Sequence, residues 1–179
     1  MFFKELNFLL SKRLNNSLFL SSILKSKINY LILKKNFIDL YAFHYNTSFL
    51  LTFLKLNTYL KFESLIDLSV VDFPKKEFRF KLVYNLLSVF YGTRLNLITF
   101  LKENSYQNSV KSLFKSSDWL EREAWDMFGI FFVNHYDLRR ILTDYGFQGF
   151  PLRKDFPLTG FIELRHDDSK GDIVYEPVE

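Results

Sequence analysis

The 179-residue sequence predicts an α+β fold: a mainly antiparallel sheet with helices on one face, followed by an extended irregular C-terminal segment. Three observations predict it. Stretches of period-2 alternation dominate residues 29–101, helical spacing occurs between them, and turn-forming residues concentrate late in the chain. Five of the six glycines and three of the four prolines lie at or beyond residue 129. A ferredoxin-like split βαβ is a special case of the same class.

Residues 1–28 are expected to form an N-terminal helical extension. Leu6, Leu9, Leu10 and Leu14 follow helical spacing within a helix expected over about residues 3–25. Lysine and arginine outnumber acids here, as in a mitochondrial presequence. Abundant phenylalanine and scarce alanine indicate an AT-biased gene, such as an organellar one, and the alternative is an AT-rich nuclear or bacterial genome. For an organellar gene, a structural amphipathic helix is the favoured interpretation.

The next elements are expected in the order strand, helix, three strands, helix. The clearest strand alternates apolar residues at even positions, from Phe78 to Tyr84, with charged residues at odd positions, from Glu77 to Lys81. Asn46 to Ser48 offer an N-cap for the first helix. The expected bounds are a strand or hairpin over 29–43, a helix over about 48–57, strands over 63–73, 77–87 and 94–101, and a short helix over 109–115.

Charge is distributed unevenly between the halves of the chain. Residues 1–90 carry 13 Lys and Arg against 6 Asp and Glu, whereas residues 91–179 carry 11 against 14. A nucleic-acid binder concentrates positive charge, so the acidic second half argues against nucleic acid there. The lysine-rich first half leaves one alternative open, a basic organellar ribosomal or RNA-binding protein. The best apolar run, residues 40–54, is too short and too polar to span a membrane.

The chain contains no cysteine, so it can form no disulfide, no Cys-ligated zinc site and no cysteine-held iron–sulfur cluster. His44, His135 and His166 lie far apart without metal-ligand spacing, and no Ser–His–Asp or P-loop pattern occurs. We therefore expect no catalytic, cofactor-binding or metal-binding residues in this chain.

Residues 118–129, DWLEREAWDMFG, combine both tryptophans with four acids. Asp118 and Glu121 fit a capping box, so a helix is expected to begin there and to end at Gly129. Glu121 and Glu123 would point about 200° apart, which excludes a joint catalytic role. Aromatic residues cover more than one side of this helix, a pattern typical of protein–protein interfaces. The alternative is an ordinary helix with one core aromatic residue and a solvated acidic face.

Residues 137–142, DLRRIL, predict a capped turn with Asp137 as N-cap and with Arg139 and Arg140 pointing outward. The functional interpretation is that their guanidinium groups bind carboxylates of a partner protein. The alternative is a pair of solvated ion pairs of little energetic value.

Residues 151–157, PLRKDFP, place Arg153, Lys154 and Asp155 between two prolines, which predicts an extended segment. As for residues 137–142, the functional interpretation is that the cationic side chains bind carboxylates of a partner protein, and the alternative is a solvated ion pair of little energetic value. Phosphate binding by these cations is disfavoured by the nearby aspartates.

Three stretches, DWLEREAWDMFGIFF, NHYDLRRILTDYGFQGFPLRKDFPL and the closing YEPVE, closely resemble the 30-kDa subunit family of respiratory NADH:ubiquinone oxidoreductase, or complex I. This family is called subunit 9 in mitochondrial genomes and also has bacterial members. The resemblance covers roughly residues 36–179 and is densest over 117–160. None of the motifs is specific alone, but their combination in this order is.

The resemblance implies a non-catalytic structural subunit of mitochondrial complex I. It would lie in the peripheral-arm quinone-reducing module, on the matrix side of the inner membrane, and hold the 49-kDa and cluster-N2-bearing subunits in register. FMN, iron–sulfur clusters and ubiquinone would belong to the complex and none of them to this chain, which the mitochondrial genome would encode. The expected partner interface consists of Trp119, Glu121, Arg122, Glu123, Trp125, Asp126, Phe128, Asp137, Arg139, Arg140, Arg153, Lys154 and Asp155.

The expected organisation is therefore an extension over 1–28, an α+β domain over 29–129 and a partner-wrapping segment over 130–179. The sequence departs from the family pattern at three positions, Tyr136, Phe150 and His166. It also stops after YEPVE, where many relatives continue, and we expect another subunit to supply the contacts of that tail.

Overall fold

The computed structural model describes residues 20, 22, 24, 27–34, 37–169 and 171–178. The helix expected over 3–25 and most of the extension over 1–28 lie outside these described residues. The elements of the described part are β1 (Ile28–Leu33), β2 (Ile38–Phe43), the 3-10 helix η1 (His44–Asn46), α2 (Thr47–Leu56), β3 (Ser64–Asp72), β4 (Phe80–Ser88), β5 (Thr93–Leu101), β6 (Tyr106–Asn108), α3 (Ser117–Phe128), β7 (Phe131–Val133), β8 (Ile162–Asp167) and β9 (Asp172–Pro177).

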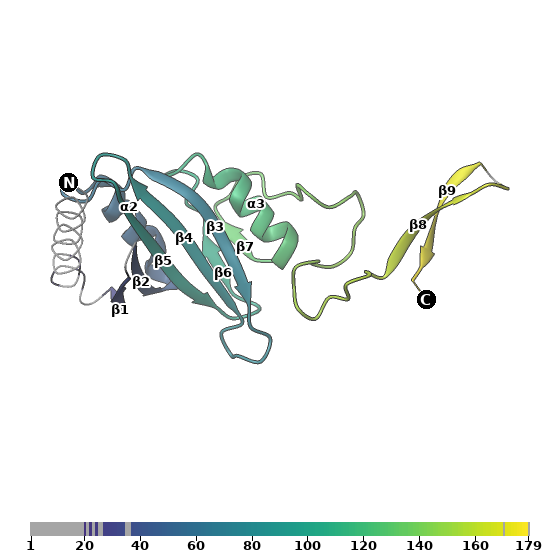
Figure 1. Ribbon diagram of the computed structural model, residues 1–179, viewed down its shortest axis with the longest axis horizontal. Helices are drawn as coiled ribbons and strands as arrows, with labels where there is room; N and C mark the ends of the chain where they lie inside the picture. Colours follow the sequence, from purple (N-terminus) through teal and green to yellow (C-terminus); the bar gives the residue numbers. More distant parts are fainter. Residues whose placement is uncertain are drawn as a thin grey trace, which may run out of the picture.

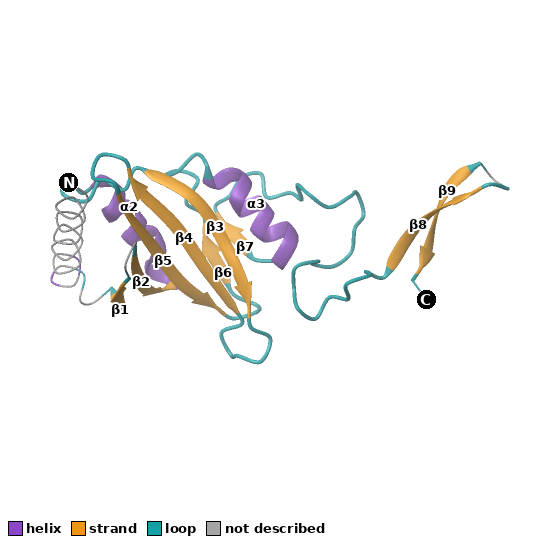
Figure 2. Ribbon diagram, in the orientation of Figure 1, coloured by secondary structure: helices purple, strands orange, loops and turns teal. Residues whose placement is uncertain are grey.

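The main sheet has five strands in the order β1-β2-β5-β4-β3 (Figures 1 and 2). Every neighbouring pair is antiparallel except β2 and β5, which are parallel. The chain passes from β2 through α2 to β3 at the opposite edge, and β4 and β5 then fill the space between them. This arrangement confirms the α+β class with a mainly antiparallel sheet. It differs from a ferredoxin-like split βαβ, because two strands, and not one, separate β2 from β3.

One face of the sheet packs against α2 and α3, the α-helices of the described part of the chain. Alternate residues of β4, from Phe80 to Leu86, are buried together with Leu50, Leu51 and Leu54 of α2 and Ala124 of α3. A strand places alternate side chains on opposite faces, so this single core defines the covered face. The helices therefore lie on one face, as the sequence predicts.

The bounds of β3, β4 and β5 agree with the three expected strands within a few residues. The alternation of buried and exposed residues expected at the start of β4 was wrong. Phe78 is exposed and Arg79 is buried, the reverse of the expected pattern. Both residues precede the strand, which begins at Phe80. Arg79 is drawn inward because its guanidinium pairs with both carboxylate oxygens of Asp72, at 2.8 and 3.0 Å.

Residues 109–115 form turns and not the expected short helix. The amides of Leu113 and Phe114 both donate to the Val110 carbonyl, while the Val110 amide itself donates to the carboxylate of Glu121. The next backbone bonds, from the Ser117 amide to the Phe114 carbonyl and from the Asp118 amide to the Lys115 carbonyl, each span three residues, so the turn at Val110 does not continue as an α-helix. The neighbouring β6 pairs in parallel with β7, and the sequence predicted neither of these three-residue strands.

The core extends past residue 129. Ile130 and Phe132 are buried in the same cluster as the sheet residues. Residues 134–161 then contain no helix or strand, as expected for an irregular segment, and they lead to the β8–β9 hairpin, which was not predicted.

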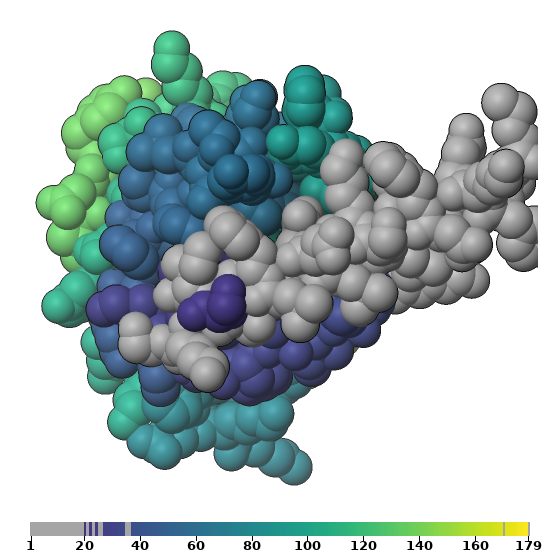
Figure 3. Space-filling model, turned by 90° about the vertical axis from the view of Figure 1, so that its left-hand side faces the viewer, coloured from purple at the N-terminus to yellow at the C-terminus, as the bar shows by residue number. Residues whose placement is uncertain are grey.

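This hairpin stands apart from the main sheet at one end of the molecule (Figure 1). From the opposite end of the molecule its yellow residues are not visible (Figure 3). Among the described residues, no helix is long and apolar enough to cross a membrane.

Two adjacent phenylalanines of β7 test the contribution of this strand to the core. Phe132 is 1% exposed and Phe131 is 51% exposed. Phe132→Ala should lower the free energy of unfolding by about 3 kcal/mol, since it leaves a cavity beneath the sheet. Phe131→Ala, the matched control, should change it by no more than about 1 kcal/mol. Urea denaturation measures both values, and equal effects of the two substitutions would contradict the assignment of β7 to the core.

Candidate protein interface

The candidate interface is built around α3, whose N-terminus differs from the expected capping box. The helix begins at Ser117, with Ser116 at the N-cap and no side-chain cap hydrogen bond. Asp118 therefore lies inside the helix. Gly129 ends the helix as predicted, with φ of 75° and its amide bonded to the Trp125 carbonyl at 2.8 Å. A Cβ at Gly129 would meet Arg153 and the Phe150 ring at 2.7 Å, so glycine also permits close approach of the C-terminal segment.

Glu121 binds the loop that precedes its own helix. Its carboxylate is fully buried and accepts hydrogen bonds from the Val110 amide at 2.8 Å and from the Ser109 hydroxyl at 2.6 Å. Burial raises the pKa of Glu121, although these hydrogen bonds act in the opposite direction. The side chain thus fixes the turn at 109–110 against α3.

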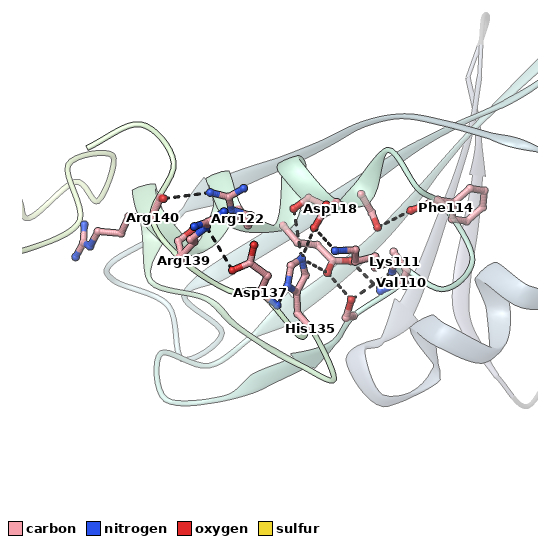
Figure 4. Close-up of polar contacts among 12 residues, drawn as sticks. Val110, Lys111, Phe114, Asp118, Arg122, His135, Asp137, Arg139 and Arg140 are labelled. Carbon is pink, nitrogen blue, oxygen red and sulfur yellow. Dashed lines mark hydrogen bonds and ion pairs between the residues drawn. The ribbon is translucent and has the colours of Figure 1, made fainter. Parts of the chain in front are cut away.

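His135, from the segment after β7, lies beside Asp118 and Glu121 of α3 and forms a polar cluster with them (Figure 4). Its fully buried ring places Nε2 3.1 Å from Asp118, and Nδ1 accepts the Asp137 amide at 3.3 Å. Lys111 also pairs with Asp118, at 2.6 Å, and lies over the Tyr136 ring, 3.5 Å from its centroid. The hydrogen bond from Lys111 leads the causes that lower the pKa of Asp118. No spacing pattern indicated this cluster in advance, since His135 is 17 positions from Asp118.

Asp126 binds the loop that follows β7. Its carboxylate is fully buried and accepts the amides of Ile141, Leu142 and Thr143 at 3.1, 2.8 and 2.9 Å. The Thr143 hydroxyl, at 2.6 Å, and Arg140 Nη1, at 3.0 Å, complete the set of donors. Burial would raise the pKa of Asp126, but the hydrogen bonds from Thr143, Leu142 and Ile141 outweigh it and lower the pKa to about 2.

The segment 137–142 does not form the expected capped turn. Asp137 instead pairs with Arg139 at 3.3 Å, and Arg139 points outward as predicted. Arg140 points inward, against expectation, because its guanidinium binds Asp126 and the Gly149 carbonyl at 3.0 Å each. Arg122 of α3 donates to the carbonyls of Arg139 and Arg140 at 3.1 and 3.3 Å (Figure 4).

The segment 151–157 folds into turns and is not extended as predicted. Arg153 donates from Nε to the Phe128 carbonyl at 2.7 Å, and its Nη1 pairs with Glu103 at 3.1 Å. The Leu152 amide donates to the Met127 carbonyl at 3.2 Å. The two carbonyls at the end of α3 are thereby satisfied by the C-terminal segment.

Arg79 connects this segment to the sheet. Besides Asp72, it pairs with Glu103 at 2.9 Å and with Asp155 at 2.8 Å. The Lys154 amide donates to Asp72 at 2.9 Å. The hydrogen bond to Asp72 is the main cause of the raised pKa of Arg79. Neither Arg79 nor Asp72 was singled out from the sequence, where they lie in an ordinary strand and turn.

The thirteen predicted interface residues therefore divide into two groups. For Glu121 and Asp126 the structure contradicts a surface role, because each carboxylate is fully buried and bound by donors of its own chain. The other eleven are exposed or half-buried, and Trp119, 68% exposed, is the most accessible aromatic residue among them. Their contact with a partner stays a prediction. Within the described residues, no group of three His, Asp or Glu side chains could hold a metal ion.

The Asp126 loop contact is testable by comparing two residues of α3. Asp126→Asn should lower the free energy of unfolding by about 3 kcal/mol, since it removes a buried charge that five donors share. Trypsin should also cleave faster after Arg139 and Arg140. Glu123→Gln, on the exposed side of the same helix, should change stability by no more than about 0.5 kcal/mol. Unchanged cleavage in Asp126→Asn would contradict the proposed loop anchor.

Comparison with known proteins assigns the family. Residues 44–162 match the model of the respiratory-chain NADH dehydrogenase 30-kDa subunit. The chain is 49% identical over 180 residues to NADH-ubiquinone oxidoreductase subunit 9 of Acanthamoeba castellanii, covering 97% of this chain and 90% of that protein. It is 56% identical over 140 residues to NADH dehydrogenase (ubiquinone) iron-sulfur protein 3 of Beta trigyna, covering 76% and 73% respectively.

A chain of the membrane-bound sulfane sulfur reductase, an archaeal respiratory membrane complex, has a similar fold. The TM-score is 0.69 at 22% identity, covering 80% of this chain and 86% of that chain. The sequence motifs, the α+β fold and the matched relatives agree, and the chain belongs to the 30-kDa subunit family of respiratory-chain NADH dehydrogenase.

Proposed function

We propose that this chain is a non-catalytic structural subunit that holds neighbouring redox subunits of mitochondrial complex I in register. The observation that supports this proposal most is that the polar and the apolar side chains of the C-terminal segment point in different directions. Its polar groups bind inward to α3 and the sheet, whereas a set of its apolar side chains is more than half exposed to solvent. The exposed set consists of Tyr136, Leu142, Tyr145, Leu152, Leu158, Phe161, Ile162, Leu164, Ile173 and Tyr175.

The inward contacts give this segment a defined position before any partner binds. Asp126 holds the backbone at 141–143, Arg153 holds the end of α3, and Arg79 joins Asp155 to the sheet. Preorganisation of this kind lowers the conformational entropy lost on association. A subunit that fixes distances between redox centres needs such a segment, because movement of the segment would change the distance between the centres.

The outward apolar side chains supply the contact surface. Large exposed apolar patches are rare on monomeric proteins and mark interaction sites. Tyrosine, tryptophan and phenylalanine are also the residue types enriched in the cores of protein interfaces. Trp119 of α3 is a further exposed aromatic residue.

The family supports a finer assignment, which we include in the proposal. The partners are the 49-kDa and cluster-N2-bearing subunits of the quinone-reducing module, on the matrix side of the mitochondrial inner membrane. FMN, the iron–sulfur clusters and ubiquinone are held by other subunits. This chain has no cysteine with which to bind a cluster, although some of its relatives carry the name iron-sulfur protein.

The alternative of a basic organellar ribosomal or RNA-binding protein has no comparable support. Family membership favours the respiratory complex, and the exposed residues of the C-terminal segment are mainly apolar and acidic. A cationic surface would be needed to bind phosphates.

Truncation after Gly160 tests the structural role. Removal of the hairpin should leave the free energy of unfolding within about 1 kcal/mol of the full chain, because β8 and β9 are largely exposed. Incorporation into the NADH dehydrogenase complex, measured on native gels with in-gel NADH oxidation, should fall at least about tenfold, since part of the contact surface is lost. A cut at Gly129 would be a poorer test, because it removes the buried Ile130 and Phe132.

The full-length chain provides the control for this experiment. It should comigrate with the NADH dehydrogenase complex and copurify with its subunits in mild detergent. Migration of the full chain as a free monomer, or with ribosomes, would contradict the proposed function.

A further inference from the structure

The β8–β9 hairpin has two chemically different faces. Cross-strand partners lie on the same face of an antiparallel pair. The pairs Leu164 with Tyr175 and His166 with Ile173, together with Ile162 and Pro177, therefore share one largely apolar face. The other face carries the pairs Glu163 with Glu176, Arg165 with Val174, and Asp167 with Asp172.

The apolar face continues into a groove of about 540 Å³. The hairpin contributes Ile162, Leu164 and Tyr175 to its lining, and the loops contribute Tyr145, Phe147 and Leu158. Tyr145 and Leu158 are fully exposed, and the two apolar residues of β8 are each 60% exposed. An isolated two-stranded hairpin is at best marginally stable in water, so this one needs a cover on its apolar face.

The opposite face restricts what the cover can be. Residues 161–178 contain five carboxylates against two cationic side chains. Arg165 forms a two-point pair with Glu176 at 2.7 and 3.0 Å, and three further carboxylates lie on the same face. A second copy of this hairpin, an anionic lipid surface or a nucleic acid would bring like charges together.

The hairpin also offers strand edges. In the described part of the chain, β8 pairs with β9 alone, so the small sheet has two edges with backbone groups available for an added strand. A strand that joins an edge directs its side chains alternately to the two faces.

We infer that the hairpin and its groove bind an extended segment of a neighbouring subunit in which apolar residues alternate with lysine or arginine. The apolar residues enter the groove beside Leu164 and Tyr175, and the cationic residues meet Glu163 and Asp172 on the other face. This inference rests on the proposed function, since it specifies the partner chemistry of the same segment.

Photo-crosslinking in the intact complex tests the identity of the occupant. The full chain carries p-benzoylphenylalanine at Tyr175, and mass spectrometry identifies the crosslinked peptide after native purification. The expected product is a peptide of another subunit with the alternating apolar and basic pattern. A crosslink to lipid, to a second copy of this chain or to an acidic peptide would overturn the inference, as would incorporation of the chain without any crosslink at this position.

A matched pair of substitutions tests the two-faced geometry. Leu164→Asp and Val174→Asp add the same charge to opposite faces of one hairpin. Leu164→Asp should lower the fraction of chain retained in the complex after a salt wash at least about fivefold, whereas Val174→Asp should leave it within about twofold. Glu163→Lys replaces a carboxylate that would pair with a cationic residue of the partner. It should lower the fraction of chain retained in the complex at low salt at least about threefold.

The outcomes separate the two claims. Equal retention of Leu164→Asp and Val174→Asp, in a full chain that still comigrates with the complex, would overturn the groove inference and leave the proposed function intact. Absence of the unmodified chain from the complex would overturn both.

Discussion

Two buried carboxylates of one helix determine how the rest of this chain is arranged. Both residues lie on α3 and bind a loop outside the helix: Glu121 accepts the Val110 amide and the Ser109 hydroxyl, and Asp126 accepts the amides of residues 141–143. A buried carboxylate must be satisfied, because an unpaired one would cost several kcal/mol. Burial therefore makes these contacts obligatory, and the loops on both sides of α3 acquire a fixed position relative to the sheet beneath it.

This constraint explains how a segment without helix or strand over 134–161 can have a defined path. Its ordering comes from side chains of the folded domain: Asp126 and Arg122 at its start, and Arg79 and Asp72 at its end. Because the polar contacts face inward, the apolar side chains remain outside. The polar side chains of this segment therefore anchor it within the chain, and under the proposed function its exposed apolar side chains form the surface for partners.

The sequence predicted the class of fold and the longer elements well, since β3, β4, β5 and α2 each have strong local periodicity. It missed β6, β7 and the β8–β9 hairpin, because three-residue strands and exposed hairpins leave little pattern in the chain. The motif residues were recognised as important, but their charges were expected to face outward. Asp126 and Arg140 pair although they are 14 positions apart, and Arg79 binds Asp155 across the fold, contacts that no local pattern encodes. Only Gly129 revealed its role directly, because helix termination is a local property.

We expect the contacts of α3 to hold the C-terminal segment in place within the isolated chain, without help from partners. Amide hydrogen exchange of the isolated full chain measures whether they do. The amides of Ile141, Leu142 and Thr143, which donate to Asp126, should exchange at least about a hundredfold more slowly than those of the exposed loop residues Gly146 and Gln148, because opening the contact costs about 3 kcal/mol. Equal exchange rates at all five amides would show that α3 does not hold this segment, which would then owe its position to partners alone.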